Sequence, residues 1–113
     1  MDIGSAVGRD AGLTAEQLAA LPNHAASDEF DELEKLALDY TDAMTRTPAS
    51  VPVELFAKLK DALGDAALVE LTSVIAWENY RARFNRAFDV APAGFSEGSF
   101  CVLPARAATV VER

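Results

Sequence analysis

Residues 66–77 read AALVELTSVIAW, and this stretch decides the fold class. Its polar members are Glu70, Thr72 and Ser73, so apolar side chains fall on nearly every side of a helix drawn through it. A helix that is apolar almost all round is expected to be covered on several sides. A chain of 113 residues has few elements of its own for that purpose. We therefore expect an all-α subunit of a homo-oligomer, in which neighbouring subunits help to cover this helix.

Glycine, proline and capping residues around this stretch predict where the last two helices begin and end. Gly64 is expected to close one helix, and Asp65 to cap the next, which runs to about Phe88. The helix before Gly64 is expected to begin at Ser50 and Pro52. Its predicted inner face consists of Leu55, Phe56, Leu59 and Leu63.

Capping residues nearer the N-terminus predict two further helices. Thr14 and Gln17 form a T-x-x-Q capping box for a short helix that Pro22 is expected to end. Ser27 is expected to cap a longer helix that ends before Pro48. One apolar stripe follows the period of that helix: Phe30, Leu33, Leu36, Ala37, Tyr40, Ala43 and Met44.

Three finer expectations accompany these helices. Residues 23–26 are expected to form a linker that leaves His24 exposed. Tyr40 is expected in the core with its hydroxyl hydrogen-bonded. Apolar side chains recur on one helical face over residues 3–11, which brings the expected number of helices to about five.

The composition excludes several classes of function. Eighteen acidic residues against ten basic ones give a net charge of −8, which disfavours nucleic acid and anionic membranes as partners. Cys101 and His24 are the single cysteine and the single histidine, too few for a disulfide framework, a metal site or a haem attachment, so no cofactor is expected. No apolar run approaches the ~18 residues of a membrane span, and the N-terminus lacks a signal-peptide pattern. A cytoplasmic protein is the expectation.

A row of polar residues follows the apolar stretch and holds the best candidates for chemistry. Glu78 and Arg81 are three residues apart, so they share a helix face. Asn79 and Arg83 are four residues apart and share another. Two interpretations remain open: these side chains form ion pairs and subunit contacts, or Glu78 or Arg86 borders a substrate cavity.

The order and spacing of several segments resemble the carboxymuconolactone decarboxylase/alkylhydroperoxidase D-like family. The resemblance implies an all-α bundle of about five helices that assembles as a trimer or hexamer and acts on a small-molecule substrate. It indicates a domain over residues 1–96, incomplete at its N-terminus, and an irregular tail over residues 97–113. The matching segments are DIGSA (2–6), GLTAEQL (12–18), FDELEKLALDY (30–40), DAALVEL (65–71) and NYRARFNRAFDV (79–90).

The chain departs from that family at the residues that carry the redox chemistry. Peroxidase-type members of the family have a C-x-x-C pair on a helix, an acidic residue upstream, and a histidine four residues after the second cysteine. The pair cycles between dithiol and disulfide. None of these residues is present here, and Gly4 takes the place of the histidine if the second cysteine falls just before Met1. Either the pair lies upstream of this start, or the protein is a non-redox member of the family.

Three functions therefore compete. The first is a thiol peroxidase that is inactive as this chain alone. The second is a cysteine-independent decarboxylase acting on a lactone or small acid, with Glu78 as general acid or base and Arg86 as a carboxylate anchor. The third is a non-enzymatic oligomerisation module, which predicts no cavity with convergent polar groups. Cys101 has no cysteine or histidine near it in sequence and is expected to be a buried or tail thiol.

Overall fold

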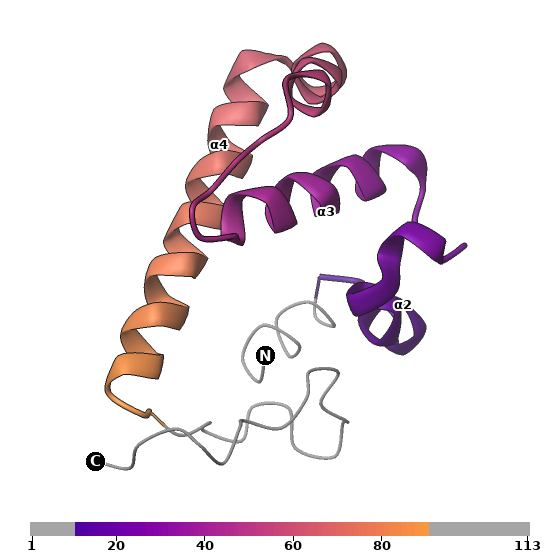
Figure 1. Cartoon of the computed structure of the whole chain (residues 1–113). Coiled ribbons are helices and arrows are strands. Elements are labelled where there is room, and N and C mark those ends of the chain that lie inside the picture. The colour runs from indigo at the N-terminus through magenta and orange to yellow at the C-terminus, as the bar shows by residue number, and fades with distance from the viewer. Residues whose placement is uncertain (1–10, 91–113) are drawn as a thin grey trace. The chain divides into compact units, whose positions relative to one another are not determined.

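The computed structural model describes residues 11–90, and within them every regular element is a helix (Figure 1). This confirms the all-α prediction for that part of the chain. The helix predicted over residues 3–11 falls almost entirely outside the described part, and the tail 97–113 with Cys101 falls wholly outside it. The elements are α2 (Ala15–Ala20), the 3-10 helix η1 (Leu21–Ala26), α3 (Glu32–Thr45) and α4 (Val53–Ala87).

Two compact units make up the chain, one of residues 30–87 and one of the residues on either side. In the second unit, α2 begins at the predicted capping box. Thr14 Oγ1 accepts a hydrogen bond from the Gln17 amide at 3.0 Å, and Gln17 Oε1 accepts one from the Thr14 amide at 3.1 Å. The two bonds satisfy two amides that a helix start otherwise leaves without partners.

The segment after α2 differs from the prediction. As predicted, α2 ends before Pro22, at Ala20, but the next residues are not a simple linker. Pro22 lies in the first turn of η1, where its missing N–H removes no helical hydrogen bond, and η1 reaches Ala26 with a kink at Asn23. His24 is only 7% exposed, and its Nδ1 lies 3.2 Å from the Leu21 carbonyl oxygen. The prediction of an exposed His24 is therefore wrong, because the tight turn holds the ring beside the carbonyl three residues earlier.

The start of α3 also lies later than predicted. Asp31, not Ser27, is the N-cap: its Oδ1 accepts from the Glu34 amide at 2.8 Å, and Glu34 Oε1 accepts from the Asp31 amide at 3.3 Å. Ser27 instead accepts a local bond from the Glu29 amide at 3.1 Å. Asp31 is the better cap because the side chains of Asp31 and Glu34 each accept a hydrogen bond from the backbone amide of the other residue. Ser27 lacks such a partner, since the side chain three residues later, Phe30, has no hydrogen-bonding group.

Gly64 divides α4 into two helical segments, residues 53–63 and 65–87, as predicted. Its φ of 79° and ψ of 169° lie in a region that only glycine occupies readily. The two segments run in different directions in Figure 1. Across the break, Lys60 Nζ lies 3.7 Å from Asp65 Oδ1, an exposed pair of the kind that adds little stability.

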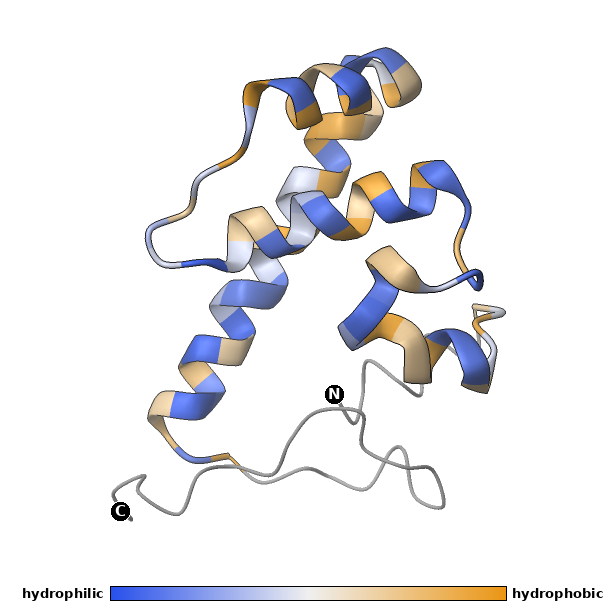
Figure 2. Cartoon of the chain, turned by 45° about the vertical axis from the view of Figure 1, so that its right-hand side comes forward, coloured by the Kyte–Doolittle hydropathy of each residue, from blue (hydrophilic) through white to orange (hydrophobic). Residues whose placement is uncertain are grey.

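The core of the 30–87 unit forms where α3 packs against both segments of α4. Figure 2 shows apolar bands alternating with polar ones along these helices, the pattern of elements buried on one side. Tyr40 is 4% exposed, and its hydroxyl lies 2.8 Å from Thr72 Oγ1, which confirms the predicted buried tyrosine. Because the Thr72 proton goes to the Leu68 carbonyl at 2.7 Å, the tyrosine must be the donor to Thr72. The fully packed members of this core are Tyr40, Leu59, Leu68 and Ile75.

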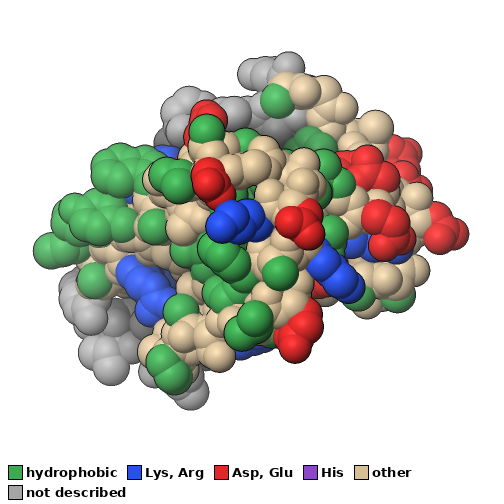
Figure 3. Space-filling view, turned by 90° about the horizontal axis from the view of Figure 1, so that it is seen from above, with side chains coloured by type: hydrophobic (Ala, Val, Ile, Leu, Met, Phe, Trp, Pro, Cys, Tyr) green, Lys and Arg blue, Asp and Glu red, His purple; other side chains and the backbone are tan. Residues whose placement is uncertain are grey.

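Two expectations about burial are not met within the chain. Phe56 was assigned to the inner face of its helix but is 44% exposed, so that assignment is wrong. The stretch 66–77 has only one side covered: Ile75 is buried, whereas Val74 and Trp77 are more than half exposed. Figure 3 shows hydrophobic side chains in several patches on one face of the molecule, among charged and other atoms.

Candidate functional surface

The polar row on α4 begins with the predicted ion pair. Arg81 Nη1 donates to Glu78 Oε1 at 2.9 Å, three residues apart on one helix face. The Glu78 side chain is 58% exposed and that of Arg81 is 37% exposed. Water therefore screens the pair, and we expect it to contribute little to folding.

Asn79 and Arg83 hold the C-terminal end of α3. The Asn79 side-chain amide donates to Thr45 Oγ1 and to the Ile75 carbonyl, both at 3.0 Å. The Arg83 guanidinium donates to the Thr45 carbonyl and to Thr47 Oγ1, both at 3.2 Å. The last carbonyls of a helix have no partner within it, so this arginine satisfies one of them and gives the pair a structural role.

Within residues 11–90, the two candidate catalytic residues do not line a common hollow. Glu78 and Arg86 are both exposed and lie eight residues apart on α4, or about 12 Å along the helix axis. Glu78 bonds to Arg81, as described above. Neither candidate lines any of the three hollows that follow α3 and α4.

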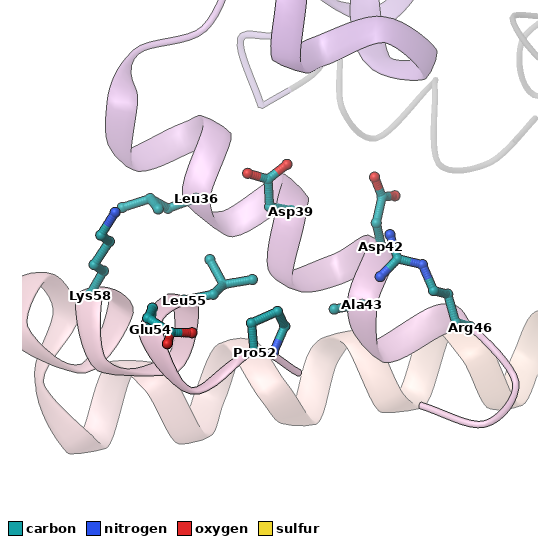
Figure 4. Close-up of a pocket in the computed structure, with 9 residues that line it drawn as sticks. All are labelled: Leu36, Asp39, Asp42, Ala43, Arg46, Pro52, Glu54, Leu55 and Lys58. Carbon is teal, nitrogen blue, oxygen red and sulfur yellow. The ribbon is translucent and has the colours of Figure 1, made fainter. Parts of the chain in front are cut away.

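The most polar of these hollows has a volume of about 390 Å³ and lies between α3 and the first segment of α4 (Figure 4). Asp39, Asp42 and Arg46 border it from α3, and Glu54 and Lys58 from α4. Apolar side chains of Leu55 and Pro52 lie between these two sets in Figure 4. Charges of both signs surround the hollow, so it presents no single sign of potential to a ligand. Sequence reasoning proposed none of the five charged residues as part of a site, because two helices contribute them and the pairing of those helices is decided by tertiary contacts.

The other two hollows are more apolar. One has a volume of about 360 Å³ and is bordered by Tyr40, Phe56 and Thr72 among others. The second, which we call the apolar hollow, has a volume of about 380 Å³, and six of its eight lining residues are apolar. Its lining residues are Leu33, Glu34, Ala37, Leu63, Ala67, Glu70, Leu71 and Val74.

The same helical segment also carries three stacked aromatic side chains, Trp77, Tyr80 and Phe84, which we call the aromatic ladder. Trp77 and Tyr80 stack with ring centroids 5.4 Å apart and planes 10° apart, and Tyr80 and Phe84 stack at 6.2 Å and 23°. All three are at least half exposed, at 59%, 59% and 50%. Their spacing of three and four residues places them on one side of the helix. The same spacing is present in the sequence, where charged residues stand between the three aromatic ones.

The described residues contain neither a candidate metal site nor a candidate membrane span. Over residues 11–90, no three His, Cys, Asp or Glu side chains cluster so as to hold a metal ion. Within the same residues, no helix combines the length and the apolar character needed to cross a membrane.

Comparison of sequences finds a relative of this chain. The protein YnjA of Escherichia coli (strain K12), itself described as uncharacterized, is 36% identical over 81 residues, which are 72% of this chain. The chain spans only 44% of the length of that relative. No family model and no solved structure matches the chain.

Proposed function

We propose that this chain is a self-associating helical module of the carboxymuconolactone decarboxylase/alkylhydroperoxidase D-like type, and that these 113 residues do not reduce hydroperoxides by themselves. The proposal includes the five-helix bundle, the trimeric or hexameric assembly and the cytoplasmic location that the sequence and its resemblance suggest. Its supports are the order of the matching segments and the helical character of the described residues.

The observation that carries the proposal is the contrast between the aromatic ladder and the polar row. Trp77, Tyr80 and Phe84 expose a contiguous apolar surface on one helix. Surfaces of that kind mark sites of association. By contrast, Asn79 and Arg83 are occupied in holding α3, and Glu78 pairs locally. This arrangement favours association over catalysis as the role of the segment.

The expected lack of peroxidase activity rests on how a cysteine is regenerated. One thiolate can reduce a hydroperoxide to an alcohol as it becomes a sulfenic acid, and a second thiol must then condense with that sulfenic acid, releasing water, to form the disulfide that a reductant opens. Cys101 is the single cysteine, so the chain cannot form an internal disulfide. A cysteine-dependent cycle would therefore require a second thiol from outside these residues.

Two measurements on the purified chain test the proposal. Light scattering after size-exclusion chromatography should give a mass that is a multiple of the chain mass of 12.1 kDa. A hydroperoxide assay with a dithiol as reductant should show no turnover above that of the reductant alone. A monomer at tens of micromolar would refute the self-association, and a robust rate that Cys101→Ser abolishes would refute the non-redox role.

A further inference from the structure

One stripe of α4 carries a pattern that fits a second copy of itself. Residues that alternate at spacings of three and four lie along one line of a helix. The line opposite the buried Leu68 and Ile75 is exposed or partly exposed throughout the 65–87 segment. We call it the outer stripe, and its members are Ala67, Glu70, Val74, Trp77, Arg81 and Phe84.

The two halves of this segment have opposite charge. Residues 65–76 contain Asp65 and Glu70 and no basic residue. Residues 77–87 contain three arginines against the single acidic residue Glu78. Two such helices therefore attract when they lie antiparallel, because each acidic half then faces the basic half of the other.

The order of residues along the outer stripe fits the same antiparallel arrangement. With a two-fold axis midway between Val74 and Trp77, each of these residues lies opposite the other in the second copy. The same axis places Glu70 opposite Arg81. In antiparallel helix pairs, the two alternating stripe positions face one another in this way. Each half of the stripe is thus complementary to the other half in both charge and size.

The outermost layer of this arrangement pairs a large side chain with a small one. The axis sets Phe84 of one copy opposite Ala67 of the other. Ala67 is a small residue that borders the apolar hollow, whose lining includes Leu63 and Leu71. A phenylalanine ring directed at this position would enter a hollow whose lining is almost wholly apolar.

We infer that the chain self-associates through an antiparallel, two-fold contact between the outer stripes of two α4 helices, with Trp77 against Val74 at the centre and a Glu70–Arg81 pair on each side. The inference rests on the proposed self-association and specifies its interface. The 65–87 segment is about 35 Å long, enough for six layers of side chains. A two-fold contact is self-complementary and closed, and it is compatible with a dimer or with a hexamer built from two trimers.

Charge exchange between two variants provides the sharpest test. Glu70→Arg alone and Arg81→Glu alone each place like charges opposite one another twice in a homodimer, so each variant should associate about tenfold more weakly than the native chain. An equimolar mixture of the two should regain native-like association, because both pairs in the mixed dimer are of opposite charge. Fluorescence anisotropy of one labelled variant titrated with the other measures this. Failure of the mixture to associate better than either variant alone would overturn the inference.

Removal of the central side chain gives an independent readout. Trp77→Ala should weaken association by about a hundredfold, since a central tryptophan is lost twice in a symmetric interface. Phe56→Ala is the matched control: its ring is 44% exposed on the other segment of α4, and its removal should leave association within about twofold of native. Circular dichroism of both variants checks that the helices persist.

The experiments distinguish failure of the two-fold contact from failure of self-association itself. A native chain that is a monomer in the sizing experiment refutes both. A native oligomer that Trp77→Ala leaves intact and that shows no rescue in the mixture refutes the two-fold contact and leaves the association standing. Rescue together with the loss on Trp77→Ala supports both.

Discussion

The inner and outer sides of the 65–87 segment are built from similar side chains but meet different surroundings. On the inner side, Leu68 and Ile75 are buried against α3, and the hydroxyl of Thr72 both accepts and donates a hydrogen bond. On the outer side, Val74 and Trp77 remain more than half exposed. Hydrophobicity alone does not separate these two sides. The contrast teaches that the inner side holds the unit together, whereas the outer side contributes little to the fold and is the side that we propose to meet a second copy.

The strongest test of this contrast uses two neighbouring residues on opposite sides. Ile75→Ala should lower the free energy of unfolding by about 3 kcal/mol, because it removes buried methyl groups and leaves a cavity. Val74→Ala should change it by less than about 0.5 kcal/mol in the monomer. Both are best measured by urea unfolding in a Trp77→Ala background, where self-association is expected to be weak. Equal losses at the two positions would remove the distinction between the sides.

A smaller effect is expected from the two tyrosines. Tyr40→Phe deletes the donor to Thr72 Oγ1 and should cost about 1 kcal/mol of unfolding free energy. The loss stays moderate because Thr72 still donates to the Leu68 carbonyl. Tyr80→Phe, on the exposed ladder, is the control and should be neutral in the same urea experiment. A neutral Tyr40→Phe would show that the buried hydrogen bond contributes nothing net.

The smallest effect is expected where the polar row meets the end of α3. Asn79→Ala removes two hydrogen bonds at a half-buried position, one of them to Thr45 of α3, and should cost about 0.5–1 kcal/mol. Asn85→Ala, exposed on the same helix, should have no measurable effect. Amide hydrogen exchange adds a local readout, since loss of the Asn79 contact should raise exchange in the last turn of α3 more than in its first. Uniform exchange along α3 would argue against this role.

The features that sequence predicts well here are those decided by residues close together in the chain. The capping box at Thr14 and Gln17, the break at Gly64 and the pairing of Glu78 with Arg81 each depend on a spacing of four residues or fewer. Local hydrogen bonds and backbone sterics determine such features, so tertiary contacts need not be known. These three features can therefore be predicted from the sequence alone.

The features that sequence missed depend on competition or on packing. Ser27 and Asp31 are both good caps, and the choice between them rests on whether the third residue after each can return a bond. The burial of His24 accompanies a turn that places its ring beside the Leu21 carbonyl, and the exposure of Phe56 depends on which side of its helix is covered. The same limit applies to the candidate site. The sequence pattern placed Glu78 and Arg86 on one helix but could not predict the hollows, because two helices form them together.

The positive φ of Gly64 shortens the distance that α4 spans. In an unbroken helix, Leu59 and Leu68 would stand about 13 Å apart along the axis, yet here they share one core. The break at Gly64 turns the chain, so a rod of about 50 Å becomes a corner with a short arm and a long one. The outer stripe therefore ends at the glycine, which would limit the registers open to a second copy in the two-fold contact proposed above.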